Sequence, residues 1–154
     1  IDHCEMLYNK VPFTGVGVNY TNNGVIEYTR YENGCDKEWL NLYKNGSLKN
    51  WDKGWCCSET SFSQQWDEDG DMTSLYENGV YTEYYKNGNK SSERYSEDMG
   101  CTNYEKSYYE NGQIKSSLDC KGCVEISADL CELSCWDSEG NKVKCTEIGV
   151  AYPW

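Results

Sequence analysis

The chain has 154 residues and a formal net charge of −12. Leu, Ile, Val and Phe together supply only 23 of those residues, which is too few for a conventional aliphatic core. The acidic balance, without clustered Lys and Arg, argues against nucleic acid and anionic membranes as partners. Because no apolar run approaches the ~20 residues that cross a bilayer, we expect no membrane insertion.

Aromatic residues and cysteines offset the thin aliphatic content. There are 14 Tyr, 6 Trp and 2 Phe, and each ring can bury about 150–250 Å². There are also ten cysteines, and a high, even count in a small chain predicts disulfides formed in an oxidising compartment. A start at Ile1 fits removal of a signal peptide, as it also fits a trimmed chain. We therefore expect a secreted or extracellular protein, or one on the surface of a cell or virion.

One short phrase recurs six times along the chain, with spacings of 22, 24, 18, 24 and 28 residues between its glycines. Asn-Gly or Asp-Gly between alternating polar and apolar residues predicts a hairpin turn. A second glycine series lies between the phrases, at Gly34, Gly54, Gly79, Gly100 and Gly122. The phrases are YTNNGVI (Gly24), LYKNGSL (Gly46), WDEDGDM (Gly70), YYKNGNK (Gly88), YYENGQI (Gly112) and WDSEGNK (Gly140).

Because both turn series are short, the simplest path is a meander of antiparallel strands. If each phrase is a three-residue loop that ends in a left-handed glycine, the residue four before the glycine faces the residue two after it. A two-residue loop would shift this register by one. The predicted pairs are Tyr20 with Ile26, Leu42 with Leu48, Trp66 with Met72, Tyr84 with Lys90, Tyr108 with Ile114, and Trp136 with Lys142.

The sequence therefore predicts an all-β fold, a single-layer antiparallel meander of repeated β-hairpins stapled by disulfides. We expect one repeat domain over residues 1–154, with an N-terminal cap at 1–18, hairpin repeats at 19–146 and a C-terminal cap at 147–154. Tyr152-Pro153-Trp154 could fold back as an aromatic cap. The one helix-compatible stretch, Val124–Leu133, is ambiguous because cysteines and β-branched residues flank it.

The segments YYENGQIKSS, LYENGVYTEYYKNG and YENGCDKEWLNLYKNG resemble the MORN-variant repeat, the unit of proteins described as YwqK-type antitoxins. The resemblance covers roughly residues 15–145. It implies an open β-hairpin array, and the antitoxin label implies that some members neutralise toxins. Arrays of this kind mostly provide binding or structural surfaces.

Most cysteines follow the second glycine series. Counting outward from Gly46 puts position 35 opposite 55, and counting from Gly112 puts 101 opposite 121. We therefore predict three disulfides that each close the base of a hairpin, and we leave Cys4, Cys123 and Cys131 without a firm partner. The predicted bonds join Cys35 to Cys56 or Cys57, Cys101 to Cys120 or Cys123, and Cys135 to Cys145.

Two metal hypotheses compete with these interpretations. The run Cys120-x-x-Cys123 followed by Cys131-x-x-x-Cys135 has spacing that tetrahedral zinc accepts, but zinc leaves six cysteines unexplained. The acidic stretch at 67–71 resembles part of a calcium loop, but it aligns with the hairpin phrase and has Asn78 where an EF-hand needs a glutamate. We expect no metal and no cofactor.

The chain offers little for catalysis. Its one histidine, His3, lies near the N-terminus, so no Ser-His-Asp or Cys-His arrangement has a natural base. We expect a non-enzymatic protein that acts through a protein partner or through self-association at sheet edges, with a glycan as the alternative partner. The candidate binding-face residues are aromatic, with adjacent tyrosines on opposite faces: Trp66, Tyr84, Tyr85, Tyr108 and Tyr109.

Overall fold

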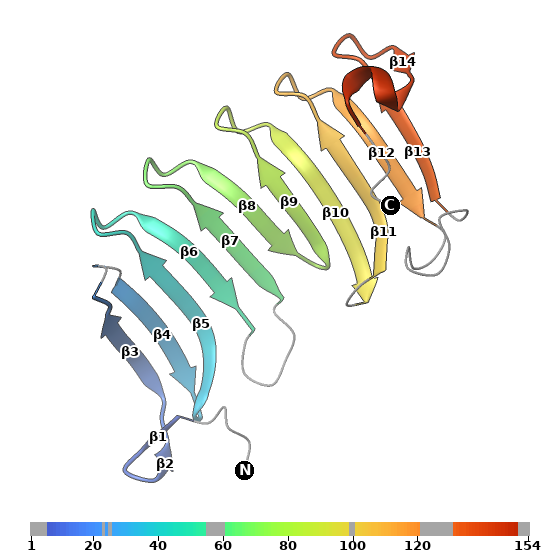
Figure 1. Cartoon of the computed structure of the whole chain (residues 1–154). Coiled ribbons are helices and arrows are strands. Elements are labelled where there is room, and N and C mark those ends of the chain that lie inside the picture. The colour runs from blue at the N-terminus through green and yellow to red at the C-terminus, as the bar shows by residue number, and fades with distance from the viewer. Residues whose placement is uncertain are drawn as a thin grey trace. The chain divides into compact units, whose positions relative to one another are not determined.

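The computed structural model of the chain describes residues 6–22, 24, 26–54, 61–98, 101–120 and 131–150, and for residues 96–98, 101 and 102 it describes the backbone alone. Within these ranges β1 (Leu7–Tyr8) and β2 (Val11–Pro12) form a small hairpin of their own. The other twelve strands form one antiparallel sheet whose order follows the chain from β3 to β14 (Figure 1). The predicted all-β meander of hairpins is confirmed.

The chain divides into two compact units, residues 1–78 and 79–154. The first unit contributes six strands to the sheet: β3 (Gly15–Tyr20), β4 (Ile26–Glu32), β5 (Cys35–Leu42), β6 (Leu48–Lys53), β7 (Phe62–Trp66) and β8 (Met72–Glu77). The second contributes β9 (Val80–Tyr84), β10 (Lys90–Asp98), β11 (Cys101–Tyr108), β12 (Ile114–Cys120), β13 (Cys131–Trp136) and β14 (Lys142–Val143), followed by the 3₁₀ helix η2 (Cys145–Ile148).

The six predicted cross-strand pairs are all present, from Tyr20 opposite Ile26 to Trp136 opposite Lys142. The turn at Gly46 shows the cause. Gly46 N donates to Tyr43 O at 2.9 Å, Tyr43 N donates to Ser47 O at 2.8 Å, and Gly46 has a φ of 88°. This is a type I turn followed by a left-handed glycine, the geometry that three-residue hairpin loops favour.

The second turn series uses the same dipeptide differently. Asn33 and Gly34 both have positive φ, at 52° and 81°, and they form a two-residue turn between Glu32 and Cys35. Two consecutive left-handed residues define a type I′ turn, which Asn-Gly prefers. The number of residues between the flanking strand partners, and not the Asn-Gly pair itself, selects the turn type.

Unit 1 has one apolar and one polar face. Its apolar face carries two rows of mostly apolar residues, Tyr20, Ile26, Leu42, Leu48, Trp66 and Met72 beside the turns, and Val18, Tyr28, Leu40, Trp51 and Leu75 in the next row, where Gln64 lies between Trp51 and Leu75. Since side chains alternate along a strand, the register neighbours point to the opposite side. The polar face of unit 1 carries the row Asn19, Glu27, Asn41, Asn50, Gln65 and Ser74, and two aromatic residues, Trp39 and Tyr76, lie on the same side.

Hydrogen bonds between side chains run across the polar face. Asn41 Nδ2 donates to Asn50 Oδ1 at 2.8 Å, and Asn50 Nδ2 donates to Asp52 Oδ2 at 2.6 Å. Asp52 is only 9% exposed, so this chain of amides gives a buried carboxylate the partner that it needs. The polar face is therefore a structured hydrogen-bond network.

The sheet has almost no conventional core. Among the described residues, Leu118 and Cys135 are the only hydrophobic residues that are buried, at 6% and 1% exposure. Both lie in unit 2, on neighbouring strands of the face opposite Tyr108. A single-layer sheet covers neither of its faces, and the fold must be stabilised by other means.

The cysteine predictions have mixed outcomes. Cys135 bonds Cys145, as expected. Cys120 bonds Cys131, so the predicted bond from Cys101 to Cys120 is wrong: Cys120 and Cys131 are direct cross-strand partners of β12 and β13, with Cα atoms 4.1 Å apart. The alternative partner of Cys101, Cys123, lies outside the described residues.

The structure leaves Cys35 as a free thiol, so the predicted bridge from Cys35 is not formed. Its expected partners, Cys56 and Cys57, lie outside the described residues, as does Cys4. Zinc coordination by the four cysteines from 120 to 135 is wrong as well, since three of them are spent in the two disulfides.

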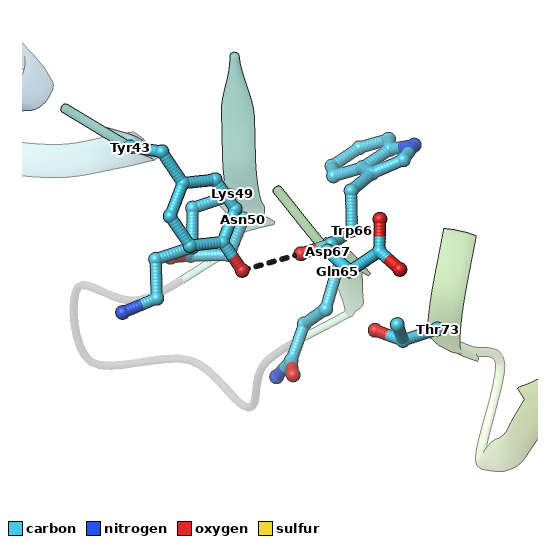
Figure 2. Close-up of a pocket in the computed structure, with 7 residues that line it drawn as sticks. All are labelled: Tyr43, Lys49, Asn50, Gln65, Trp66, Asp67 and Thr73. Atoms are coloured by element: carbon cyan, nitrogen blue, oxygen red, sulfur yellow. Dashed lines mark hydrogen bonds between the residues drawn. The ribbon is translucent and has the colours of Figure 1, made fainter. Parts of the chain in front are cut away.

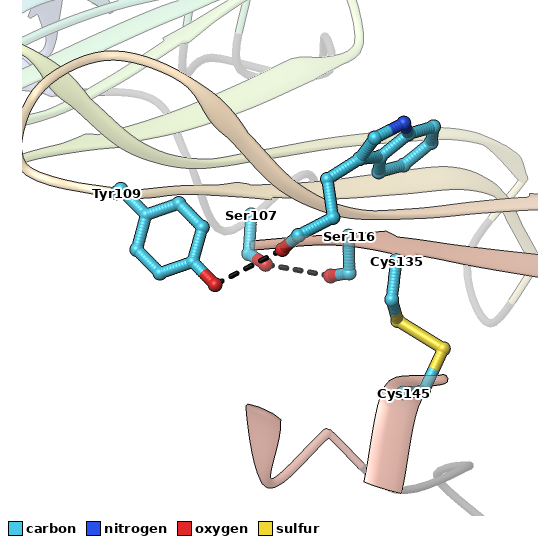
Figure 3. The surroundings of a disulfide bond; sticks show 6 residues. Ser107, Tyr109, Ser116, Cys135 and Cys145 are labelled. Atoms are coloured by element: carbon cyan, nitrogen blue, oxygen red, sulfur yellow. Dashed lines mark hydrogen bonds between the residues drawn. A yellow bond between two sulfur atoms is a disulfide. The ribbon is translucent and has the colours of Figure 1, made fainter. Parts of the chain in front are cut away.

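The terminal segments agree only in part with the predicted caps. β3 begins at Gly15, inside the expected N-terminal cap. Residues 131–133 of the helix-compatible stretch belong to strand β13, and its remaining residues, like Tyr152-Pro153-Trp154, are not described. The bond between Cys135 and Cys145 holds η2 against the strand beside it (Figure 3).

Replacing Cys145 by Ser should lower the free energy of unfolding by up to about 3 kcal/mol, because the native disulfide closes a short loop in the unfolded chain. Cys35→Ser is the matched control, since it breaks no disulfide in the structure. Denaturant unfolding of both variants would measure the difference. Equal stability of the two variants would contradict a stapling role for the Cys135–Cys145 bond.

Candidate binding surface

Tyrosines at the hairpin turns join each hairpin to the next. The Tyr43 hydroxyl donates to the carbonyl of Trp66 at 2.9 Å. In unit 2, Tyr85 donates to the carbonyl of Tyr108 at 2.7 Å, and Tyr109 to that of Trp136 at 3.0 Å (Figure 3). Each bond spans 23 or 27 residues of sequence. We call these three bonds the tyrosine locks.

Asparagines one residue before the turn glycines add a second set of bonds. Asn45 Nδ2 donates to Glu68 O at 3.2 Å, Asn87 Nδ2 to Glu110 O at 2.8 Å, and Asn111 Nδ2 to Ser138 O at 3.1 Å. A repeat with Tyr-x-Asn-Gly at its turn therefore supplies two donors to the next turn. The Tyr-x-Asn-Gly pattern stands in the sequence at residues 43–46, 85–88 and 109–112, but the sequence analysis did not predict these bonds between turns.

Turns with an aspartate in place of the tyrosine accept hydrogen bonds from their own backbone. Asp67 Oδ1 accepts from the N–H groups of Asp69 and Asp71, each at 3.0 Å. Asp137 Oδ1 accepts in the same way from Glu139 and Asn141. The Asn141 side chain bonds Asp137 as well, and these bonds lower the pKa of the Asp137 carboxyl.

This parallel explains the acidic stretch at 67–71. The ligand atoms of Asp67, Asp69 and Asp71 lie within 4.8 Å of one another. However, Asp137 performs the same turn-closing role as Asp67 in a turn that has Ser138 in place of Glu68 and Asn141 in place of Asp71. The hairpin geometry thus accounts for Asp67 without a metal ion.

The five candidate binding residues fall into two groups. Trp66, Tyr84 and Tyr108 each stand at a cross-strand pair beside a turn, opposite Met72, Lys90 and Ile114. Tyr85 and Tyr109 form tyrosine locks, so their hydroxyls are engaged within the protein. Tyr85 and Tyr109 hold neighbouring hairpins together, and a contact role for Trp66, Tyr84 and Tyr108 stays a prediction.

A depression of about 240 Å³ lies beside the lock of unit 1. Figure 2 shows Tyr43, Gln65 and Thr73 around it, with the Trp66 indole directed away from Gln65 and Thr73. The backbone carbonyl of Trp66 therefore accepts the bond from Tyr43, and its indole ring lies on the apolar face of unit 1. The remaining lining residues are Lys49, Asn50 and Asp67, so the depression is rich in hydrogen-bonding groups.

Aromatic rings and cations also meet on the apolar side of unit 1. Trp51 and Phe62 pack edge to face with ring centroids 5.2 Å apart, and Lys53 Nζ lies 3.9 Å from the Trp51 ring centroid. A lysine over an indole adds cation–π attraction and covers part of the ring. Trp51 and Phe62 are therefore engaged with each other and with Lys53.

Unit 2 carries a charged cluster in place of the apolar rows. Glu93 accepts from Lys90 Nζ and from the Tyr104 hydroxyl, the latter at 3.3 Å. The bond from Lys90 lowers the pKa of Glu93 and raises that of Lys90. Burial, followed by the nearby Glu93 charge, raises the pKa values of Tyr104 and Tyr108. Lys90 and Glu93 thus form an ion pair that lies close to Tyr104 and Tyr108.

The described part of the chain contains no helix with the length and hydropathy that a membrane crossing requires. The two disulfides indicate a non-reducing, extracellular-type environment.

Comparison with known proteins adds little to this description. No family model matches the chain, and no curated protein matches it. Among solved structures, the chain is similar to a chain in the crystal structure of a GtfA/B complex bound to UDP and GlcNAc, at 12% identity and a TM-score of 0.30. The match covers 77% of this chain and 27% of that one. So low a score carries no argument about function, and the resemblance to MORN-variant repeats stays a prediction.

Replacing Tyr43, Tyr85 or Tyr109 by Phe should each lower the free energy of unfolding by about 1 kcal/mol, because a carbonyl of the next hairpin loses its donor. Tyr20→Phe is the matched control. Its side chain is 74% exposed, and a surface change of this kind stays within about 0.5 kcal/mol. Urea unfolding would measure all four variants, and a loss no larger than that of Tyr20→Phe would refute the locks.

Glu93→Gln should make stability less sensitive to acid. A carboxyl with a lowered pKa in the folded state stabilises the protein above its ordinary pKa and loses that effect as the pH falls through the lowered value. The variant should be less stable than the natural protein by about 0.5–1 kcal/mol at neutral pH, and the two should converge below about pH 4. Glu105→Gln, an exposed change on β11, is the control, and the difference in stability between this variant and the natural protein should not change with pH. Unfolding curves from pH 3 to 8 would test both variants.

Proposed function

We propose that this protein is a non-catalytic, secreted or surface-exposed β-hairpin repeat protein that acts through protein–protein interaction or as a structural component. One observation carries the proposal. The hairpins are joined along their turns by the tyrosine locks and the asparagine bonds, while large side chains on the sheet faces stay half-covered. The stability of the repeat therefore does not require that its faces be buried within the chain.

The apolar face of unit 1 is the surface best suited to a protein partner. Its row beside the turns carries Leu42 opposite Leu48, and Trp66 opposite Met72. Tryptophan and other large side chains in a shielded setting supply most of the energy of protein contacts. Trp66 can serve as such an anchor because the lock uses only its carbonyl.

A glycan is the second candidate partner, and the depression beside Tyr43 supports it. An aromatic ring next to the amides of Asn50 and Gln65 and the carboxylate of Asp67 offers a stacking surface with hydrogen-bonding groups for sugar hydroxyls. This site lies on the polar face of unit 1, whereas the Trp66 indole lies on the apolar face. The two candidates thus predict different residues.

An antitoxin role, implied by the MORN-variant resemblance, has less support. Toxin neutralisation of that kind takes place in the cytoplasm, where thiols are kept reduced. Two disulfides between described cysteines do not suit that compartment.

Trp66→Ala and Gln65→Ala form a matched pair, adjacent in sequence and on opposite faces, that distinguishes the two functions. If a protein binds the apolar face, Trp66→Ala should weaken binding at least about tenfold, the loss expected of an anchor residue, and Gln65→Ala should leave it unchanged. Affinity should be measured by surface plasmon resonance with the partner recovered by cross-linking on native material. The reverse pattern on a glycan array would favour the carbohydrate site, and indifference to both changes would refute both surfaces.

A further inference from the structure

The two ends of the sheet differ in how open their edges are. β14 consists of two residues, Lys142 and Val143, and is followed by Lys144 and by the disulfide-held η2. Short length and lysines are among the devices by which proteins block an edge. The strand at the other end, β3, has six residues, Gly15–Tyr20, and none of them is charged.

β3 also exposes a row of apolar side chains. Val16, Val18 and Tyr20 are alternate residues, so they share a face of the strand, and they are 57%, 47% and 74% exposed. Among the described residues, all the exposed large hydrophobic side chains lie between Met6 and Tyr20. An uncharged, apolar edge of this length favours pairing with another strand.

We propose that β3 pairs antiparallel with β3 of a second copy of this chain, forming a closed dimer. A two-fold axis at Val18 would set Val18 against Val18 of the other copy, and Val16 against Tyr20 on either side. Pairs of aromatic and β-branched residues stabilise antiparallel strands. The backbone supports the same arrangement, because an antiparallel strand directs alternate N–H and C=O groups to each of its two neighbours.

Charge restricts where two copies of the chain can meet. Two chains with a formal charge of −12 each repel one another, and an uncharged strand is the place where they can approach at least cost. The nearest acidic partner on β4, Glu27, already accepts a hydrogen bond of 2.8 Å from Asn19. Its charge is therefore partly satisfied within the same copy.

The contrast between the edges also sets the symmetry. A head-to-tail filament would pair β3 with β14, which offers two residues beside lysines and η2. Pairing of β3 with itself is isologous and closes after two copies. The dimer rests on the proposed function, since it identifies one partner of a repeat protein that acts by association.

Sedimentation velocity of the isolated chain, from about 1 μM to about 300 μM, is the first test, because a single strand pair makes a small and therefore weak interface. A dimer should form as concentration rises. Val18→Lys should abolish it across this range, since it places two ammonium groups together at the axis. Val11→Lys is the matched control, an exposed valine (62%) in the separate β1–β2 hairpin, and it should leave the dimer intact.

A second variant with the opposite charge at position 18 shows whether loss of the dimer is due to charge or to misfolding. Val18→Glu alone should also be monomeric, and mixing it with Val18→Lys should restore a dimer, because only the axis position brings the two opposite charges together. Hydrogen exchange should slow in residues 15–20 as the natural chain dimerises and stay unchanged at 142–143.

Three results would overturn the proposal: a monomer at every concentration, a dimer insensitive to Val18→Lys, or an assembly that keeps growing with concentration. If the isolated chain stays monomeric, β3 is left to pair with a strand of a different protein. None of these results bears on partner binding at Trp66 or Gln65, which the matched pair of alanine variants measures separately.

Discussion

The structure depends on a three-residue turn closed by a left-handed glycine. At Gly46 the backbone completes two hydrogen bonds across the loop, and the φ of 88° is one that other residues adopt only with strain. Because side chains alternate with a period of two, a shift of one residue would move every apolar side chain to the opposite face. The turn therefore decides which face of unit 1 is apolar.

Hydrogen bonds and disulfides replace the missing core. A single-layer sheet with two buried hydrophobic residues among those described gains little from burial. The tyrosine locks join the turn of one hairpin to the next, and their phenol rings are half-buried against it. The Cys120–Cys131 bond joins the neighbouring strands β12 and β13, and the Cys135–Cys145 bond joins β13 to η2. Stability thus comes from contacts between neighbouring repeats, as in other solenoid-like arrays.

Because the contacts between repeats lie at the turns and disulfides, the two faces of unit 1 and the β3 edge can contact a partner. Tyr85 and Tyr109 hold hairpins together, whereas Trp66 contributes only its carbonyl to a lock and keeps its ring for the apolar face. The polar face carries its own network through Asn41, Asn50 and Asp52. The same repeat therefore presents chemically different surfaces, and β3 adds an uncharged edge to them.

The repeated phrase alone determined the fold class and the register, because turn geometry is local: each glycine and its neighbours specify the loop, and the loop specifies the pairs that flank it. The tertiary structure decided what depends on the distance between repeats. The partner of Cys120 is Cys131 across a strand pair, and the Tyr43 hydroxyl reaches a carbonyl 23 residues away. Such contacts depend on how adjacent hairpins align side by side, which the number of residues between two glycines does not specify.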